Sequence, residues 1–191
     1  MYLSGDPDAD RLLAEDDLAL LIGMLLDQQV PMETAFAGPA KIRDRLGAFD
    51  AAAIAATEMP ALIEVFQQSP AVHRFPKSMA ERTQQLCEAV VGSWDGDASA
   101  IWTRGEPDGK EVLGRLVALP GFGAQKARIF LAMLGKQREL EIPGWREASA
   151  PYGEPDSFLS AADIVDAHSL ARVRENKRAA KAAAREIRDR R

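Results

Sequence analysis

Cysteine is almost absent from this chain of 191 residues. Cys87 is the single one, so no disulfide can form within the chain, and no disulfide-linked partner is expected. For the same reason, a zinc site or an iron–sulfur cluster held by four cysteines is excluded. So little cysteine fits a reducing compartment, and we therefore expect a cytoplasmic protein.

Histidines and long apolar runs are also scarce. His73 and His168 are far apart, without the spacing of metal ligands, so we expect no metal held by side chains. No run of 18 apolar residues occurs, which excludes a predicted membrane-spanning helix. Residues 1–10 are acidic and polar, unlike the basic and apolar parts of a signal peptide. Neither a phosphate-binding glycine loop nor a Gly-x-Ser-x-Gly elbow is present.

The charge of −5 argues against a general nucleic-acid binder, but it is unevenly distributed. Residues 172–191 carry nine basic and three acidic side chains, which gives this segment +6 and the remainder −11. A basic C-terminal helix of this kind can follow a row of phosphates. The alternative is a solvated helix of Ala, Arg and Lys with no partner.

Hydrophobic spacing predicts helices throughout, and no alternating β pattern of any length occurs. Asp16 and Asp17 are suited to cap a helix that is apolar on nearly all sides and should be central and buried. Residues 141–156 interrupt the pattern with Pro and Gly, and Trp145 and Tyr152 are candidates to anchor this irregular segment. The expected helices cover residues 18–26, 31–46 with a stop at Gly47, 51–57, 60–67, 76–94, 110–118, 124–135 and about 167 onwards.

One loop joins two of these helices so tightly that they must form an antiparallel pair. Its sequence is Leu119-Pro120-Gly121-Phe122-Gly123-Ala124-Gln125-Lys126-Ala127. Pro120 ends the first helix, and both glycines are expected to allow positive φ and a close approach of another backbone. The second helix begins with unpaired N–H groups, which favour an anion such as a nucleic-acid phosphate.

This loop resembles the helix-hairpin-helix of the DNA glycosylase superfamily that is named for that element and for Gly-Pro-Asp. The resemblance implies that Gly121, Phe122, Gly123, Gln125 and Lys126 grip the DNA backbone beside a lesion. Amide groups of this loop would contact phosphate, with Lys126 assisting. The alternative is an ordinary pair of helices joined by a Pro-Gly turn.

The resemblance extends to Leu26-Asp27-Gln28-Gln29-Val30, where the family has an apolar helix that ends in a Gln-containing turn. In the family this Gln enters the duplex near the lesion, and Gln29 is the best match, with Gln28 beside it. A polar pair at a helix end is the alternative. The stretch Phe75-Pro76-Lys77-Ser78-Met79-Ala80 then follows at the expected distance, so that the likeness covers roughly residues 15–135.

Two departures from the family concern the chemistry. Gln125 stands where bifunctional members have a catalytic Lys, so Schiff-base lyase chemistry is excluded there. The family's catalytic Asp would fall on Pro143 and Gly144, with Glu141 and Glu147 as the nearest acids.

A later stretch offers another acid. Ile164-Val165-Asp166-Ala167-His168 resembles the family's Val-Asp-Thr-His, displaced by about twenty residues. This resemblance makes Asp166 the catalytic candidate, with His168 as its neighbour. The alternative is that Asp166 simply caps the following helix.

The sequence therefore predicts an all-α helical bundle of the DNA glycosylase type over residues 1–171, followed by a basic C-terminal helix over 172–191. The expected activity is monofunctional DNA N-glycosylase, a hydrolase in base excision repair that flips a damaged or mispaired base out of double-stranded DNA. The resemblance also implies a monovalent cation on hairpin carbonyls, no iron–sulfur cluster, and a nucleoid location. The alternatives are a DNA-binding protein that has lost the carboxylate and a helical module that contacts protein.

Overall fold

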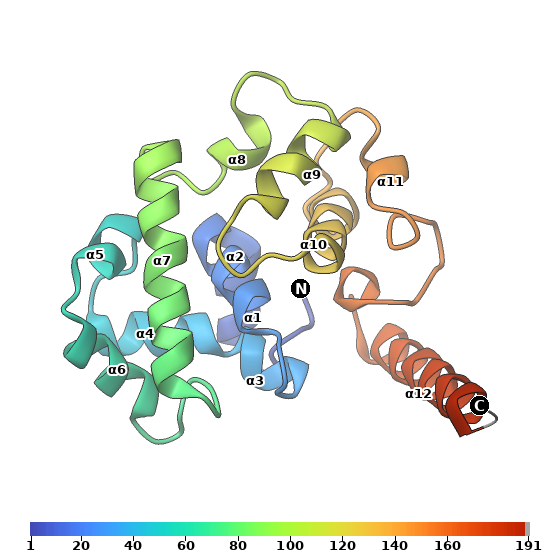
Figure 1. Cartoon of the computed structure of the whole chain (residues 1–191), viewed down its shortest axis with the longest axis horizontal. Coiled ribbons are helices and arrows are strands. Elements are labelled where there is room, and N and C mark those ends of the chain that lie inside the picture. The colour runs from blue at the N-terminus through green and yellow to red at the C-terminus, as the bar shows by residue number, and fades with distance from the viewer. Residues whose placement is uncertain (190–191) are drawn as a thin grey trace.

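The computed structural model describes residues 1–189, and it contains helices but no strand over that range. Figure 1 shows α1 and α2 near the centre, with α4 to α7 on one side, α9 to α11 on the other, α8 above the centre and α12 projecting from the body. The all-α prediction is confirmed. The elements are α1 (Pro7–Glu15), α2 (Asp17–Leu26), α3 (Met32–Phe36), α4 (Gly38–Leu46), α5 (Ala51–Ala56), α6 (Met59–Gln67), α7 (Pro76–Trp94), α8 (Ala100–Thr103), α9 (Gly109–Val117), α10 (Ala124–Gln137), α11 (Trp145–Ala148), η1 (Ala161–Asp163) and α12 (Ala167–Asp189).

Helix α2 forms the centre of the core, as predicted from its sequence. Every residue from Leu18 to Leu26 is buried, because a helix that is apolar on all sides gains free energy only when other elements cover its whole surface. The Asp16 carboxylate caps the helix by accepting a hydrogen bond from the Ala19 N–H at 2.7 Å.

The single helix predicted for residues 31–46 is wrong, because the structure divides it into α3 and α4 at Ala37. Pro39 has no N–H to donate to the Ala35 carbonyl, and its ring would collide with that carbonyl in a continuous helix. In the first turn of α4, Pro39 needs no such donor. Gly47 ends α4 with φ of 74°, as expected for a left-handed C-cap.

The N-terminal segment holds a helix that the composition of residues 1–10 did not reveal. Asp6 caps α1 by accepting hydrogen bonds from two N–H groups of its first turn. The Asp10 carboxylate accepts the N–H groups of Leu3 and Ser4 at 2.9 and 2.8 Å. These bonds hold the buried Leu3 side chain in the core.

The helices that flank the hairpin are confirmed, and α10 buries the face that its spacing predicts. Ala127, Phe130, Leu131 and Leu134 are all buried. The Phe130 ring packs edge-on against Phe122, with the ring centroids 5.9 Å apart. The end of α9 and the start of α10 are therefore fixed to one another by the core.

The segment from 141 to 156 is mostly irregular, with the one-turn helix α11 inside it. Trp145 and Tyr152 pack partly buried against the core, as expected of anchors. The Trp145 ring lies directly on Gly135 of α10, where a Cβ atom would come within 2.3 Å of the ring. Because Gly135 has no side chain, the Trp145 ring can pack directly on α10 and hold this segment there.

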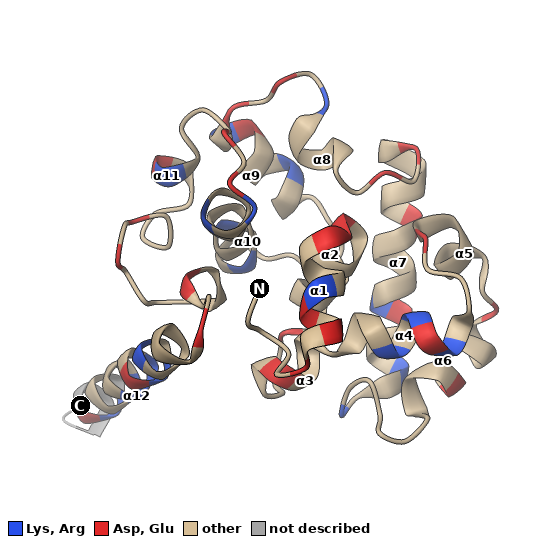
Figure 2. Cartoon of the chain, turned by 180° about the vertical axis from the view of Figure 1, so that it is seen from behind, with Lys and Arg blue, Asp and Glu red and all other residues tan. Residues whose placement is uncertain are grey.

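Helix α12 begins as predicted and carries most of the basic C-terminal charge. Val173 is buried, whereas the following described side chains are exposed. In Figure 2, blue segments of Lys and Arg alternate with red ones along α12, and red segments of Asp and Glu lie on α1, α2 and α3, beside blue on α1. The predicted basic residues Arg190 and Arg191 lie outside the described part of the chain, as does the side chain of Arg188.

Replacing Gly135 by Ala should destabilise the fold, because the new methyl group would displace the Trp145 ring. We expect a loss of about 1–3 kcal/mol in the free energy of unfolding, measured by urea denaturation. The matched control is Gly92→Ala on the exposed side of α7, where a Cβ has open space. That change should be neutral or stabilising by up to about 1 kcal/mol. Equal effects at the two positions would contradict the anchoring role of Gly135.

Candidate nucleic-acid interface

The loop between α9 and α10 is held by backbone hydrogen bonds between residues three apart in the sequence. The Leu119 N–H donates to the Leu116 carbonyl and the Phe122 N–H to the Leu119 carbonyl, each at 3.1 Å. Gly121 has φ of +81°, as predicted, and a Cβ there would come within 2.4 Å of Leu25 Cδ1. Gly121 therefore meets both requirements for glycine, a left-handed backbone and a close neighbour.

The prediction of positive φ at Gly123 is wrong. Gly123 has φ of −82° and ψ of 168°, which is the extended conformation of an N-cap residue. No atom lies within 4 Å of the position that a Cβ would occupy there. The absence of a side chain at Gly123 thus leaves open space in front of the helix start.

The N-terminus of α10 presents its first amide groups to that open space. The first hydrogen bond of the helix runs from the Ala127 N–H to the Gly123 carbonyl at 3.0 Å. The N–H groups of Ala124, Gln125 and Lys126 therefore come before the first hydrogen bond of the helix and have no partner within it. Ala124 and Gln125 are exposed, and the positive end of the helix dipole favours an anion at this place.

The side chain of Phe122 does not join this exposed surface. It is 4% exposed and packs against Phe130, and Lys126 Nζ lies 5.9 Å from its ring centroid. The ring anchors the loop from below, so the part of Phe122 on the loop surface is its backbone.

The Gln28–Gln29 turn is built from several hydrogen bonds around Gln28. Gln28 Nε2 donates to the Leu25 carbonyl at 2.8 Å, and Arg82 Nη1 donates to Gln28 Oε1 at 2.7 Å. Gln29, which is exposed, has φ of +58°. A residue other than glycine is strained in this region, and such strain persists only where its surroundings fix it.

His73 supports the same turn from inside the protein. The Phe75 N–H donates to His73 Nδ1 at 3.1 Å, so the ring proton lies on Nε2, which donates to the Gln28 carbonyl at 3.0 Å. Burial lowers the pKa of His73 below its usual value. The sequence indicated no role for His73, because its partners become neighbours only in the fold.

Lys126 joins the hairpin to the end of α2. Its Nζ donates to the carbonyls of Met24 and Leu25 at 2.6 and 2.8 Å, where the last turn of a helix lacks partners. Burial lowers the pKa of Lys126 to about 8, although the charge of Asp27 opposes this shift. These bonds bring the start of α10 beside the end of α2, from which the Gln28–Gln29 turn follows.

The chain was compared with known protein families, curated proteins and solved structures. The model of the HhH-GPD superfamily of base excision DNA repair proteins matches residues 22–190. The chain belongs to this superfamily. No curated protein and no solved structure was found to match. Base excision repair, with DNA as the partner, is therefore the process in which this HhH-GPD protein acts. Over residues 1–189, no helix is long and apolar enough to cross a membrane.

Gln125 of this HhH-GPD protein donates from its Nε2 to the Tyr152 hydroxyl at 2.9 Å. This bond links the exposed start of α10 to the irregular segment. Lys126 points instead toward α2, as the rotation of about 100° between successive helical residues requires.

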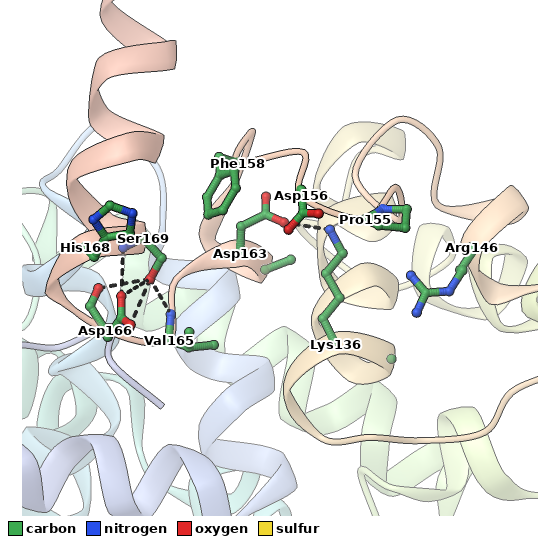
Figure 3. A pocket seen from close by; sticks show the side chains of 12 residues that line it. Lys136, Arg146, Pro155, Asp156, Phe158, Asp163, Val165, Asp166, His168 and Ser169 are labelled. Atoms are coloured by element: carbon green, nitrogen blue, oxygen red, sulfur yellow. Dashed lines mark hydrogen bonds and ion pairs between the residues drawn. The ribbon is translucent and has the colours of Figure 1, made fainter.

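The sequence candidate Asp166 lies at the start of α12. Its carboxylate accepts hydrogen bonds from the Ser169 N–H and hydroxyl, both at 2.7 Å, which is the geometry of a helix cap. These bonds lower the pKa of this exposed group. Figure 3 shows Asp166 turned toward Ser169 at one side of a pocket of about 460 Å³.

That pocket lies at the far end of α10 from the hairpin. Lys136, another lining residue, pairs with Asp163 at 2.6 Å. Lys136 follows Ala124 by twelve residues in α10, which corresponds to about 18 Å along the helix. Glu141 and Glu147, the other candidates, are exposed on the irregular segment. The pocket that Asp166 lines is therefore not at the hairpin.

One acid beside the hairpin was missed by the sequence analysis. Asp27 ends α2 and is partly buried. Burial raises the pKa of Asp27, while the charges of Lys177 and Lys126 lower it. The only signal in the sequence was its place within Leu26-Asp27-Gln28-Gln29-Val30, where the glutamines carried the resemblance.

The depressed pKa of Lys126 predicts a pH-dependent stability. Between about pH 8 and 10.5, Lys126 is neutral in the folded chain but still protonated in the unfolded chain. The unfolded state then binds more protons, so stability rises with pH through this window. The test is urea unfolding of wild type and Lys126→Met at about pH 7 and about pH 10. From the lower to the higher pH, the free energy of unfolding of wild type should increase relative to that of Lys126→Met. A difference that is independent of pH would contradict the prediction.

Proposed function

We propose that this protein is a monofunctional DNA N-glycosylase that hydrolyses the glycosidic bond of a damaged or mispaired base. The observation that carries the proposal is the pair of hydrogen bonds from Lys126 to the end of α2. Because of them, the start of α10 with its exposed amides lies beside the end of α2, which leads into the strained Gln29. One duplex can then contact both segments.

The proposed DNA contacts are of two kinds: some hold the phosphate backbone in position, and others enter the duplex. Backbone N–H groups at Gly121, Gly123 and Gln125 bind phosphate, which fixes the duplex without reading its sequence. The Lys126 ammonium has three donors and uses two on α2, so the third remains for a phosphate. Gln29, with Gln28 behind it, enters the duplex and supports the extrusion of the target nucleotide.

Helix α12 adds a sequence-independent attraction in this proposal. Its described basic side chains after Val173 are exposed. Arg174 forms an ion pair with Glu33 of α3, which fixes the helix to the body. Lys and Arg along such a helix attract the phosphate backbone.

Two features bear on cofactors. Gln125 replaces the Lys of lyases, so the reaction requires only water and a carboxylate and leaves an abasic strand. A monovalent cation, which the family implies, fits carbonyls of the hairpin, because a carbonyl that accepts one hydrogen bond retains a second lone pair. The Leu119 carbonyl is of this kind.

A second function is favoured by one specific observation. Asp166, the carboxylate implied by the displaced motif, is bonded to Ser169 at the opposite end of α10. In this second function, the protein lacks a catalytic carboxylate at the hairpin, and it binds DNA without hydrolysing the glycosidic bond.

Gly123→Val tests the hairpin contact. The substitution meets no atom within 4 Å and no positive φ, so the fold should persist while the new side chain blocks the approach of a phosphate. We expect duplex affinity to fall at least about tenfold, measured by fluorescence anisotropy. Gly92→Val, in open space on α7, is the matched control and should bind as wild type. Unchanged affinity of Gly123→Val would remove the hairpin from the interface.

The chemistry is tested on a panel of duplexes with damaged or mispaired bases. We expect release of a free base and an intact abasic strand, with no covalent adduct after borohydride treatment, because Gln125 cannot form an imine. Base release coupled to strand cleavage or adduct formation would refute the monofunctional mechanism. Duplex binding without base release from any substrate would instead support the non-catalytic function.

A further inference from the structure

The irregular segment between α10 and η1 contacts both ends of α10. Near the end of that helix, Lys136 Nζ donates to the Glu154 carbonyl at 2.7 Å. At its start, Gln125 Nε2 donates to the Tyr152 hydroxyl at 2.9 Å. Gln125 and Lys136 are eleven residues apart in α10, which corresponds to about 16 Å along the helix. The segment therefore brings one aromatic side chain to the hairpin end of α10.

The backbone around Tyr152 is fixed by the segment itself. The Tyr152 N–H donates to the Ser149 carbonyl at 3.0 Å, and Arg146 Nη1 donates to the Gly153 carbonyl at 3.0 Å. A Cβ atom at Gly153 would come within 2.4 Å of Ser149 Oγ and within 2.5 Å of the Arg146 carbonyl oxygen, so this turn requires glycine. The Tyr152 side chain packs partly buried against the core. A side chain that is held in this way loses little further freedom when it binds a ligand.

The Tyr152 hydroxyl retains a proton that it can donate. A tyrosine hydroxyl can both accept and donate, and its oxygen here accepts from Gln125. Among residues 1–189, the hydroxyl has no other hydrogen-bond partner. Gln125 is exposed and Tyr152 is only partly buried, so the hydroxyl lies at the surface beside the start of α10.

The groups around this hydroxyl favour a phosphate as its acceptor. The exposed residues Ala124 and Gln125 begin α10 with N–H groups that have no partner within the helix, and the helix dipole is positive there. A base edge presents donors as well as acceptors, whereas phosphate oxygens only accept. A phosphate can therefore receive hydrogen bonds from the hydroxyl and from the neighbouring amides together.

We propose that the Tyr152 hydroxyl donates a hydrogen bond to a phosphate of the DNA strand that the hairpin holds. Gln125 is the positioning residue that orients this hydroxyl. The inference rests on the proposed contact between the hairpin and DNA, and it adds a residue from outside the two hairpin helices. Because Tyr152 is neutral, its contact releases no counterion from the phosphate. Its contribution to affinity is therefore independent of salt, in contrast to that of Lys and Arg along α12.

Tyr152→Phe tests the contact, with Tyr2→Phe as the matched control, since these are the two tyrosines of the chain. Each change removes one hydroxyl and keeps the ring, so thermal unfolding should be retained. The probe is a duplex with a tetrahydrofuran abasic site, and binding is measured by fluorescence anisotropy at several salt concentrations. Tyr152→Phe should bind about three- to tenfold more weakly with an unchanged salt slope, and Tyr2→Phe should bind as wild type. Unchanged affinity of Tyr152→Phe would overturn the proposal.

A second measurement identifies the phosphate. A methylphosphonate linkage, which replaces one charged oxygen by a methyl group, is moved one position at a time along the strand that carries the abasic site. At one linkage, this change should weaken the binding of wild type more than that of Tyr152→Phe, because the variant has already lost the contact. At the other linkages, the two proteins should lose affinity equally. Equal losses at every linkage would show that the hydroxyl has no phosphate partner.

Gln125→Met tests the orienting role, because methionine keeps the length of the side chain and removes its amide. The change should weaken binding by wild type at least about twofold and cause no further loss in Tyr152→Phe, since the two side chains act as a unit. Additive losses would contradict this role of Gln125.

Failure of the hairpin contact would appear differently, as Gly123→Val that binds DNA as wild type, and it would overturn this proposal as well. Failure of the glycosylase activity alone would appear as no base release from any lesion, with these binding results unchanged.

Discussion

The contact on which the rest of the interface depends is the pair of hydrogen bonds from Lys126 Nζ to the carbonyls of Met24 and Leu25. A helix C-terminus leaves its last carbonyls without partners, and a lysine from the hairpin supplies them here. The start of α10, which follows the hairpin, is thereby joined to the end of α2 at Leu26. Burial of the ammonium group disfavours its charged form, and this lowers the pKa of Lys126.

An acidic protein can still present a surface for DNA when its positive elements are local. The chain carries −5 overall, but the exposed start of α10 offers partial positive charge from its amides, and α12 offers full charges from Lys and Arg. Acidic residues lie on α1, α2 and α3 (Figure 2). The distribution of charge, more than its sum, decides which surface meets phosphate.

Much of the fold follows from local sequence rules. The apolar run of α2, the stop at Gly47 and the Gly121 turn each rest on one segment, so they were predicted correctly. The break at Ala37 was predictable in principle from Pro39 but was hidden by the apolar pattern around it. Helix α1 was missed because residues 1–10 were judged by their charge, whereas Asp6 and Asp10 serve as hydrogen-bond acceptors for the backbone.

The sequence by itself determined the family, the hairpin and the absence of a lysine nucleophile at Gln125, because these depend on contiguous residues. Only the tertiary structure decided which side chains share a site. Asp166 follows a motif in the chain, yet folding places it beside Ser169 at the far end of α10. Lys126 belongs to the hairpin in the sequence, yet folding directs its Nζ to the carbonyls of Met24 and Leu25 at the end of α2. Electrostatic interactions depend on distances in space, and spacing along the chain does not determine these between separate helices.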